Sequence, residues 1–276
     1  TRSKKRGNTQ RIFEIFHYHG AQDEILYEAH PHIGTDRLPQ VIKNMRQRII
    51  DCGGEIHFNS CVNEFIVEFD AIKGVRCTNG LTYIADNVIL ATGHSARDIY
   101  HLLHRQGIRI EAKGFAMGVR AEHPQALIDS IQYHCRERNQ YLPAASYGLV
   151  HQVDGRGVYS FCMCPGGILV PAMTDAAQSV VNGMSPSGRN SQWANSGLVT
   201  EVRPEDYAHL MEEHGALAGL VFQQQLEEAA RLNGGERQVA PAQRVSDFVA
   251  GRASTSLPRT SYIPGLKSSR LDQWMP

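Results

Sequence analysis

Residues 87–98, NVILATGHSARD, decide how the fold of this chain is interpreted. The first five are mostly apolar, which is typical of a parallel strand covered on both faces of its sheet. Thr92 and Gly93 follow directly, and a glycine at the end of such a strand lets a ligand approach the backbone closely. Residues 96–105 then predict a helix. A buried strand, a turn with glycine and a helix form one half of a dinucleotide-binding site.

The other half of such a site is a glycine-rich turn, G-x-G-x-x-G, which follows a strand and opens a helix. Only Gly155 and Gly157, in DGRGVYSF, have the G-x-G spacing, and a β-type run follows them instead of a helix. We therefore interpret DGRG as a hairpin turn. The P-loop pattern G-x-x-x-x-G-K-[ST] is absent as well. The sequence thus contains no phosphate-binding loop of its own.

The residues before this stretch predict a helix and several strands, which fit a parallel sheet with helices packed against it. Residues 38–50 have apolar side chains at helical spacing, with Thr35 as N-cap and Gly53 and Gly54 as C-cap. The turn Asn79-Gly80 is typical of a hairpin. The expected strands are residues 55–58, 62–69, 72–77, 81–84 and 87–91. We expect a parallel sheet with an antiparallel meander inserted before its last strand.

The pattern changes from residue 107 onward. Short strands separated by Gly, Pro and Asp predict a second, mostly β region that extends to about residue 202. Residues 207–232 predict a helix that stops at Gly234 and Gly235. The tail from residue 240 on is rich in Ser, Pro and Arg, and we expect it to be weakly structured.

Composition and charge exclude several classes of protein. The 276 residues include 28 Lys+Arg and 28 Asp+Glu, so net charge gives no electrostatic reason to expect a nucleic-acid partner. No apolar run approaches the roughly 20 residues that cross a bilayer, so we expect no membrane association. Six dispersed cysteines favour a reducing, cytoplasmic location over a disulfide scaffold. The N-terminus has neither an initiator Met nor a signal peptide, and we expect a fragment of a longer chain.

Six sequence blocks, in this order, resemble a family of uncharacterised FAD-dependent dehydrogenases: PHIGTDRLPQVIKNMR, VILATGHSARD, FAMGVRAEHPQALIDSIQY, VYSFCMCPGG, NGMSPSGRNSQWANSGLV and APAQRVSDF. The family is related to the two-domain flavoproteins whose FAD domain has the glutathione-reductase type of fold. The resemblance covers most of residues 31–248. It implies an α/β class, α+β overall: a partial three-layer FAD/NAD(P)-binding-like domain with a β-meander, and an inserted, mostly β second domain.

The resemblance also implies domain boundaries and a function. Residues 1–106 would form the partial FAD domain, 107–235 the inserted substrate-type domain with a C-terminal helix, and 236–276 a segment that returns toward the FAD domain. Family members carry their G-x-G-x-x-G turn upstream of this chain and a second glycine-rich FAD segment downstream of it. The intact parent would therefore be an FAD-dependent oxidoreductase acting on an unidentified small molecule, whereas this fragment alone would be inactive and could lack FAD. The alternative is a non-catalytic flavoprotein or a module that binds RNA or another partner.

The resemblance places the cofactor near the turn with which we began. Ala91, Thr92 and Gly93 would pass close to the ribose and pyrophosphate of FAD. Val62 would offer its backbone N–H and C=O to the adenine edge, although a core valine is the other interpretation. The polar residues after the turn, among them His94 and Arg97, either begin the helix or face the flavin or an acidic substrate. Histidine can move protons near neutral pH, and arginine can bind a carboxylate or phosphate.

The block FCMCPGG contains Cys162 and Cys164. Three interpretations remain open: structural cysteines, a redox-active or pocket-lining pair, and metal ligands. No second cysteine pair follows at zinc-finger spacing, so we expect no metal. A C-x-C disulfide would be strained, and the thiolate pKa would decide reactivity. Gly166 and Gly167 indicate a backbone that something approaches closely.

Two further blocks carry polar side chains. RAEHPQ supplies Arg120, Glu122 and His123, which form either an acid–base cluster or solvated strand ends. NGMSPSGRNSQWANSG is a long polar loop with Arg189 and Asn195 among its members, and we interpret it as a lid, a substrate-facing segment or interface packing.

Overall fold

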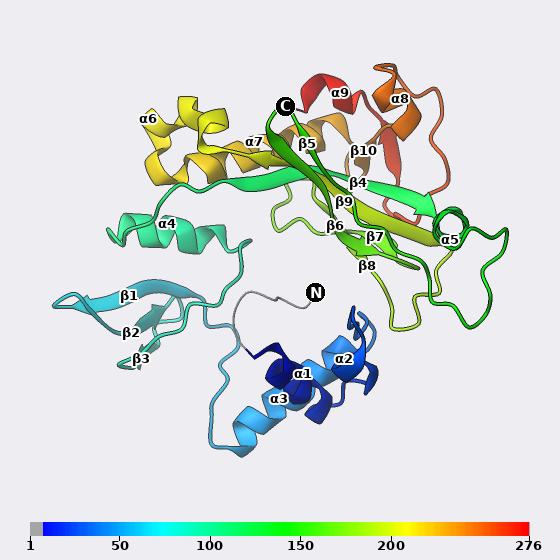
Figure 1. Ribbon diagram of the computed structural model, residues 1–276. Coiled ribbons are helices and arrows are strands. Elements are labelled where there is room, and N and C mark those ends of the chain that lie inside the picture. The colour runs from blue at the N-terminus through cyan, green and yellow to red at the C-terminus, as the bar shows by residue number, and fades with distance from the viewer. Residues whose placement is uncertain (1–7, 276) are drawn as a thin grey trace. The chain divides into compact units, whose positions relative to one another are not determined.

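The computed structural model describes residues 8–275 and has a mixed α and β fold with several antiparallel sheets, which confirms the expected fold class (Figure 1). The chain forms two compact units, each described by itself below. Unit 1 comprises the described residues of Thr1–Gly53, Phe115–Val202 and Leu226–Pro276. Unit 2 comprises Gly54–Gly114 and Arg203–Gln225.

The main sheet of unit 1 is antiparallel, with the strand order β4-β9-β6-β5. Its strands are β4 (Phe115–Pro124), β5 (Val150–Val153), β6 (Arg156–Cys164) and β9 (Trp193–Val202). Asp154 and Gly155 connect β5 to β6, both with positive φ, as a tight two-residue hairpin requires. The interpretation of DGRG as a hairpin turn is therefore confirmed. The predicted mostly β region is confirmed as well.

A second hairpin, β7 (Ile168–Pro171) with β8 (Val181–Met184), contacts β4, β6 and β9 of the main sheet. The helix α5 (Gln125–Tyr133) follows β4 directly and packs on the sheet through Ile128, which meets Ala145 and Ala194 in one buried cluster. The sheet is thus held between side chains from α5 and from this hairpin. These contacts fix the strand ends that carry the candidate site.

The N-terminal helices of unit 1 have their own small core, built by Ala21, Ile25 and Val41. They are α1 (Thr9–Tyr18), α2 (Glu24–Tyr27) and α3 (Leu38–Asp51). The helix expected after residue 37 is confirmed, and Gly53, with φ 84°, lies just beyond its end. The expected N-cap is wrong: Arg37 precedes α3, and the Thr35 hydroxyl donates instead to the Ser185 carbonyl oxygen at 3.3 Å.

The C-terminal part of unit 1 has more regular structure than its composition indicates. Its short elements are β10 (Ala240–Ala242), α8 (Val245–Val249), β11 (Leu266–Ser268) and α9 (Leu271–Trp274). The parallel pair β10–β11 packs through Ala240 against Leu169 and Tyr262, all of which are buried. The expectation of a weakly structured tail is therefore wrong, because this apolar cluster stabilises short segments that have little propensity of their own.

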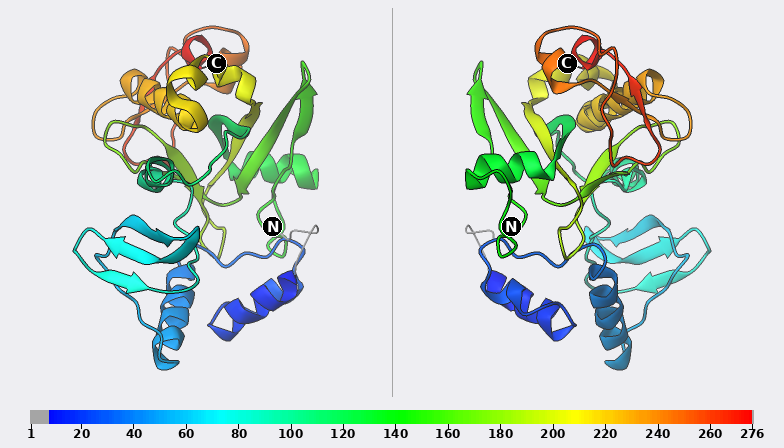
Figure 2. Two further views of the ribbon diagram at one scale, coloured as in Figure 1. Left: turned by 90° about the vertical axis from the view of Figure 1, so that its left-hand side faces the viewer. Right: turned by 90° about the vertical axis from the view of Figure 1, so that its right-hand side faces the viewer.

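Unit 2 contains the predicted antiparallel meander, β1 (Val62–Glu68), β2 (Ala71–Cys77) and β3 (Thr82–Ile84). Figure 2 shows these three strands, in cyan, from two further sides. The Gly80 N–H donates to the Cys77 carbonyl oxygen at 2.9 Å, so the predicted Asn79-Gly80 turn is confirmed. The helix α4 (Arg97–Arg105) packs on the meander, and Phe65, Ile99 and Leu102 form the core between them.

The helix predicted over residues 207–232 is interrupted. The structure has η1 (Pro204–Leu210), α6 (Met211–His214), η2 (Gly215–Leu217) and α7 (Ala218–Asn233) in its place. Gly215 has φ 52°, which is outside the right-handed helical region, so the chain changes direction there. Only α7 is a long helix, and it ends at Asn233, directly before the predicted stop at Gly234.

Two predicted strands, residues 55–58 and 87–91, are wrong: neither segment is a strand. Without a neighbouring strand, their backbone N–H and C=O groups have no ladder to join. Ile89 is 91% exposed and Leu90 is 47% exposed, although the apolar run predicts burial. The parallel sheet that these two strands would have formed is therefore absent from the described residues. Among those residues, the strands that pair in parallel are β10 and β11.

Candidate functional site

Cys162 and Cys164 lie at the end of β6, where the strand departs from regular pairing. The register with β9 runs from Phe161–Gly197 to Cys164–Asn195, so β6 has one extra residue there. Cys162 lies in this bulge with φ 48°, a left-handed backbone conformation that non-glycine residues rarely adopt. It is exposed, whereas Cys164 is buried, and both are free thiols. The bulge thus presents one thiol to solvent and keeps the other inside.

The side chain of Arg120, from β4, reaches across β9 to this bulge. Its Nη1 donates to the carbonyl oxygen of Cys162 at 3.3 Å and to Cys164 Sγ at 4.0 Å. Two asparagines hold the guanidinium: Asn195 Oδ1 accepts from Nη1 at 2.5 Å, and Asn182 Oδ1 accepts from Nη2 at 3.0 Å. On β9, the residue paired with both Arg120 and Phe161 is Gly197. Because Gly197 has no side chain, nothing on β9 at that position blocks the Arg120 side chain. We call Arg120, Cys162, Cys164, Asn182 and Asn195 the dithiol cluster.

Asn195 is fully buried, yet its Nδ2 has no hydrogen-bond partner among residues 8–275. A buried amide group without a partner costs about 1–3 kcal/mol, so such groups are rare in native proteins. Gly183, on β8, leaves the space for this arrangement. A Cβ there would lie 2.0 Å from Asn195 Oδ1 and 2.3 Å from Arg120 Nη1. The β7–β8 hairpin therefore covers the dithiol cluster only because position 183 has no side chain.

The two thiols have opposite pKa shifts. Hydrogen bonding from the Cys164 thiol, together with the positive charge of Arg120, lowers the pKa of Cys162 to about 5. The pKa of Cys164 is raised, because its proton is held by Cys162 and because burial disfavours the charged form. These shifts favour ionisation of the exposed sulfur and protonation of the buried one. A thiolate is the nucleophilic form of cysteine.

Gly166 and Gly167 follow the cysteines, and another part of the backbone packs closely against them, as the sequence predicts. The neighbour is a segment of this chain: a Cβ at Gly166 would lie 1.8 Å from the carbonyl oxygen of Arg189, and one at Gly167 would lie 2.5 Å from that of Met184. The Ser185 hydroxyl also donates to the Pro165 carbonyl oxygen at 3.0 Å. These glycines thus allow close packing of residues 184–189 on the strand that carries the thiols.

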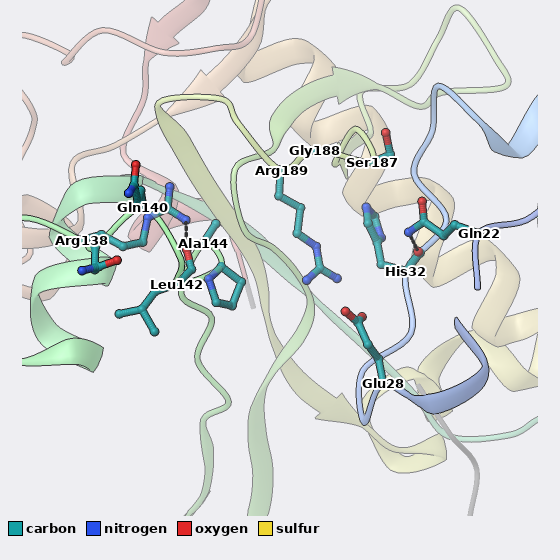
Figure 3. Close-up of a pocket in the computed structure, with 12 residues that line it drawn as sticks. Gln22, Glu28, His32, Arg138, Gln140, Leu142, Ala144, Ser187, Gly188 and Arg189 are labelled. Atoms are coloured by element: carbon teal, nitrogen blue, oxygen red, sulfur yellow. Dashed lines mark hydrogen bonds between the residues drawn. The ribbon is translucent and has the colours of Figure 1, made fainter. Parts of the chain in front are cut away.

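The same polar segment lines a pocket of about 390 Å³ in unit 1 (Figure 3). Figure 3 shows the guanidinium of Arg189 extending into it, on the side of Glu28 and His32. The Nε atom of Arg189 is buried and has no hydrogen-bond partner within the described part of the chain. Three segments contribute the lining: Gln22, Glu28, His32, Arg138, Asn139, Gln140, Leu142, Pro143, Ala144, Ser187, Gly188 and Arg189.

One wall of this pocket is fixed by a contact between the segment before α3 and the loop after β8. Asp36 accepts hydrogen bonds from the Ser187 backbone N–H and hydroxyl, each at 2.7 Å. These bonds lower the pKa of Asp36. The His32 ring donates to the Pro186 carbonyl oxygen at 3.0 Å. Gly34, with φ 98°, packs so closely that a Cβ would lie 2.3 Å from the Ser187 nitrogen.

The block RAEHPQ does not form one acid–base cluster. Arg120 belongs to the dithiol cluster, whereas Glu122 accepts hydrogen bonds from the backbone N–H and hydroxyl of Ser261. The His123 ring is hydrogen-bonded to the Tyr147 hydroxyl at 2.9 Å, and burial lowers its pKa. Alternate residues of a strand point to opposite faces, so β4 separates His123 from the other two.

In unit 2, the turn after residue 91 borders a smaller pocket of about 220 Å³, lined by Leu90, Thr92, Gly93, Ile99, Tyr100 and Leu103. Gly93 has φ 80°, and no atom lies within 4 Å of the position that its Cβ would occupy. The predicted residues His94 and Arg97 do not line this pocket. Ala91 and His94 are exposed. Val62 packs against the core of unit 2, as a core valine would, and its predicted cofactor contact stays a prediction.

Cys162 and Cys164 lie together in the dithiol cluster, and Thr92 and Gly93 both line the smaller pocket. The catalytic and cofactor-binding roles predicted for these four residues remain predictions. Asn182 and Gly183 belong to the block NGMSPSGRNSQWANSG, to which sequence reasoning gave the role of one polar loop, whereas its two ends are strand residues of β8 and β9. No sequence signal could have placed Asn182 and Gly183 at the cluster, because β8 meets Arg120 only through the folding of the hairpin onto the sheet. Among residues 8–275, no group of three or more His, Cys, Asp or Glu side chains could hold a metal ion. In the same range, no helix is long and apolar enough to cross a membrane.

Comparisons with known proteins match most of the chain. A family model described as "FAD-dependent protein, C-terminal domain-like" matches residues 114–276. An uncharacterised protein of Clostridium beijerinckii is 41% identical over 261 residues, which cover 93% of this chain. The match covers 48% of that relative, so the chain spans about half the length of the relative it matches. The family match includes every member of the dithiol cluster.

Proposed function

The chain belongs to the family described as FAD-dependent protein, C-terminal domain-like, and from this premise we propose that the protein is an FAD-dependent oxidoreductase, of dehydrogenase type, that acts on a small molecule. The family match is the observation that carries the proposal. The earlier resemblance supports its finer part, the dehydrogenase chemistry. Flavins transfer hydride or single electrons, and the protein around them positions the reactants.

The residues at the turn in unit 2 fit one part of FAD. Gly93 is open on the side where a Cβ would point, and its positive φ turns the backbone there without strain. A pocket of about 220 Å³ is smaller than the roughly 300–1,000 Å³ typical of cofactor sites. We infer that Thr92 and Gly93 contact one segment of the dinucleotide by their backbone, with Ala91 beside them. The adenine contact of Val62 belongs to the same proposal.

For the substrate we propose the 390 Å³ pocket of unit 1, whose volume suits a small molecule. Arg189 extends into the pocket with a buried Nε that has no partner among the described residues. A guanidinium binds carboxylates and phosphates through paired hydrogen bonds. An acidic group on the substrate would therefore dock at Arg189, and Glu28 would favour a second, cationic group. His94 and Arg97 remain proposed catalytic residues on the cofactor side.

The first test is the binding of FAD by the full-length protein. We expect a yellow protein with flavin absorption, a thermal unfolding midpoint raised by added FAD, and loss of the absorption when a substrate reduces the flavin in the absence of oxygen. A colourless protein that FAD does not stabilise would contradict the proposal. FAD binding without any flavin reduction would favour the alternative, a non-catalytic flavoprotein.

A pair of glycine variants tests the site itself. Gly93 and Gly80 both have positive φ, 80° and 84°, and both have open space around the position of a Cβ. Alanine at either position imposes the same backbone strain, about 1–2 kcal/mol. We expect Gly93→Ala to weaken FAD binding about tenfold, because its methyl group occupies the approach to the backbone, while Gly80→Ala leaves binding unchanged. Equal losses in both variants would mean that the turn has no special role.

A further inference from the structure

We propose that Cys162 and Cys164 form a thiol–disulfide exchange centre, in which Cys162 attacks a disulfide of a small molecule or an exposed chain segment and Cys164 resolves the product. This activity goes beyond the flavin chemistry proposed above and does not depend on it. It rests on the geometry of the dithiol cluster in unit 1.

The exposure of the two thiols fits the two roles. The attacking sulfur must meet its substrate, and Cys162 is exposed. The resolving sulfur only has to reach its neighbour, and Cys164, 7% exposed, lies inside. Cys164 Sγ is 3.4 Å from the carbonyl oxygen of Cys162, so the buried thiol packs directly against the residue with which it would react.

The two cysteines flank Met163 at the bulge of β6, where a disulfide between them would have to form. In a regular strand, residues i and i+2 are about 6.8 Å apart, at the upper limit of the Cα–Cα distance that a disulfide spans. The bulge and the left-handed residue at position 162 bend the strand there, so the pair does not lie in regular strand geometry. Non-glycine residues in this conformation are strained by about 1–3 kcal/mol, and such strain is concentrated at functional sites.

The surroundings favour the reactive form of Cys162. The guanidinium of Arg120 lies 4.0 Å from Cys164 Sγ and donates to the Cys162 carbonyl oxygen, and Asn182 and Asn195 hold it there. Hydrogen bonding from Cys164 and the charge of Arg120 lower the pKa of Cys162 and so favour its thiolate. The Asn195 Nδ2 group, without a partner among the described residues, supplies a further donor within the cluster. Purely structural cysteines need none of these features.

The reaction balances without a further reactant. The Cys162 thiolate attacks one sulfur of R–S–S–R, the S–S bond breaks, and R–S⁻ leaves as a mixed disulfide forms. Cys164 then gives its proton to the leaving thiolate and attacks Cys162 Sγ, which releases the second R–S⁻. The substrate gains two electrons and becomes one thiol and one thiolate, and the protein loses two electrons and becomes a disulfide. A disulfide closed across one residue is strained, and strained disulfides are the labile ones that serve in exchange.

The first experiment measures the reactivity of Cys162 in the full chain. Reduced protein is treated briefly with iodoacetamide at a series of pH values, and each cysteine is followed by peptide mass. An ordinary exposed thiol is almost fully protonated at about pH 6. We expect Cys162 to react about tenfold faster there than Cys52, an exposed cysteine outside the cluster, with a rate nearly constant from about pH 6 to 8. Equal rates at Cys162 and Cys52 would overturn the proposal.

The second experiment uses oxidised glutathione as the disulfide. We expect the wild-type chain to lose two hydrogens and to gain no glutathione, because the Cys162–Cys164 disulfide forms. Cys164→Ser should stop at the mixed disulfide, with one glutathione on Cys162. Cys162→Ser should lose the fast reaction, and Cys52→Ser should behave as wild type. Thermal unfolding of each variant checks that the fold is kept.

Either of two results would overturn the inference: a wild-type chain that stays reduced in oxidised glutathione, or a Cys162→Ser variant that reacts as fast as wild type. Gly183→Ala gives a test that leaves both cysteines in place. Its methyl group would displace Asn195 and Arg120, so we expect slower alkylation of Cys162 at about pH 6. An unchanged rate in this variant would show that the cluster does not activate the thiol.

Discussion

Arg120 connects its own strand of unit 1 to three others through a single side chain. It runs from β4 across β9 to the bulge of β6 and also reaches Asn182 on β8. Its removal would leave the fully buried Asn195 without its hydrogen-bond donor. A buried polar group that loses its partner costs about 1–3 kcal/mol. The residue therefore matters for stability as well as for the charge beside the thiols.

We expect Arg120→Gln to lower the free energy of unfolding by about 2 kcal/mol, measured by urea denaturation. The same variant should slow the alkylation of Cys162 at about pH 6, because the positive charge that lowers the thiol pKa is gone. Arg109→Gln is the matched control, because Arg109 is 87% exposed and pairs with the exposed Glu111. It should change stability by less than about 0.5 kcal/mol. Similar losses in both variants would argue against a buried role for Arg120.

At the scale of elements, the turn after β6 depends on close backbone packing. Gly166 has φ 54°, and a Cβ there would lie 1.8 Å from the Arg189 carbonyl oxygen. We expect Gly166→Ala to destabilise unit 1 by about 3 kcal/mol, the sum of left-handed strain and of overpacking against a backbone that cannot move aside. The loop of residues 184–189 should loosen with it, as hydrogen exchange at Arg189 and Ser191 would show.

The control for this variant is Gly155→Ala. Gly155, in the hairpin turn between β5 and β6, has φ 75° and nothing within 4 Å of its Cβ position. Alanine there adds the left-handed strain without the clash, so the loss should stay near 1–2 kcal/mol. Equal losses of stability in the two variants would contradict the close packing of residues 184–189 on Gly166.

The elements also show where local sequence signals suffice. The meander of unit 2 and the β5–β6 hairpin were predictable, because their turns lie within a few residues of the strands they join. Residues 55–58 and 87–91 carry equally clear apolar patterns but are not strands. A strand requires a neighbour for its hydrogen bonds, and no local pattern states whether the neighbour is present.

At the scale of the whole molecule, stability should decrease in acid. Hydrogen bonds lower the pKa of three carboxylates in unit 1: Asp36 through Ser187, Asp247 through Arg252 and Ser254, and Asp272 through Arg270, the last to about 2. A carboxylate with a lowered pKa in the folded state stabilises the fold above its unfolded value of 3.8, and this contribution is lost as the pH falls through the folded value.

We therefore expect the urea midpoint to be constant above about pH 5 and to fall steadily from about pH 4 to pH 2. Asp36→Asn should have a lower midpoint at neutral pH and a shallower acid decline, because it lacks one of the three groups. Asp154→Asn, in the exposed β5–β6 turn, is the control and should follow wild type. A midpoint independent of pH in this window would contradict the assigned hydrogen bonds.

The sequence by itself determined the mixed class, the long helices α3 and α4, the meander, the hairpin at DGRG and the resemblance to FAD-dependent proteins. Each of these depends on residues close in the chain or on blocks of sequence. Only the tertiary structure decided the dithiol cluster, because Arg120 lies 42 residues before Cys162 and 75 before Asn195. It also decided that Thr35 contacts Ser185 instead of capping α3. A local cap contributes about 1 kcal/mol, which the packing of the two segments around Gly34 can override.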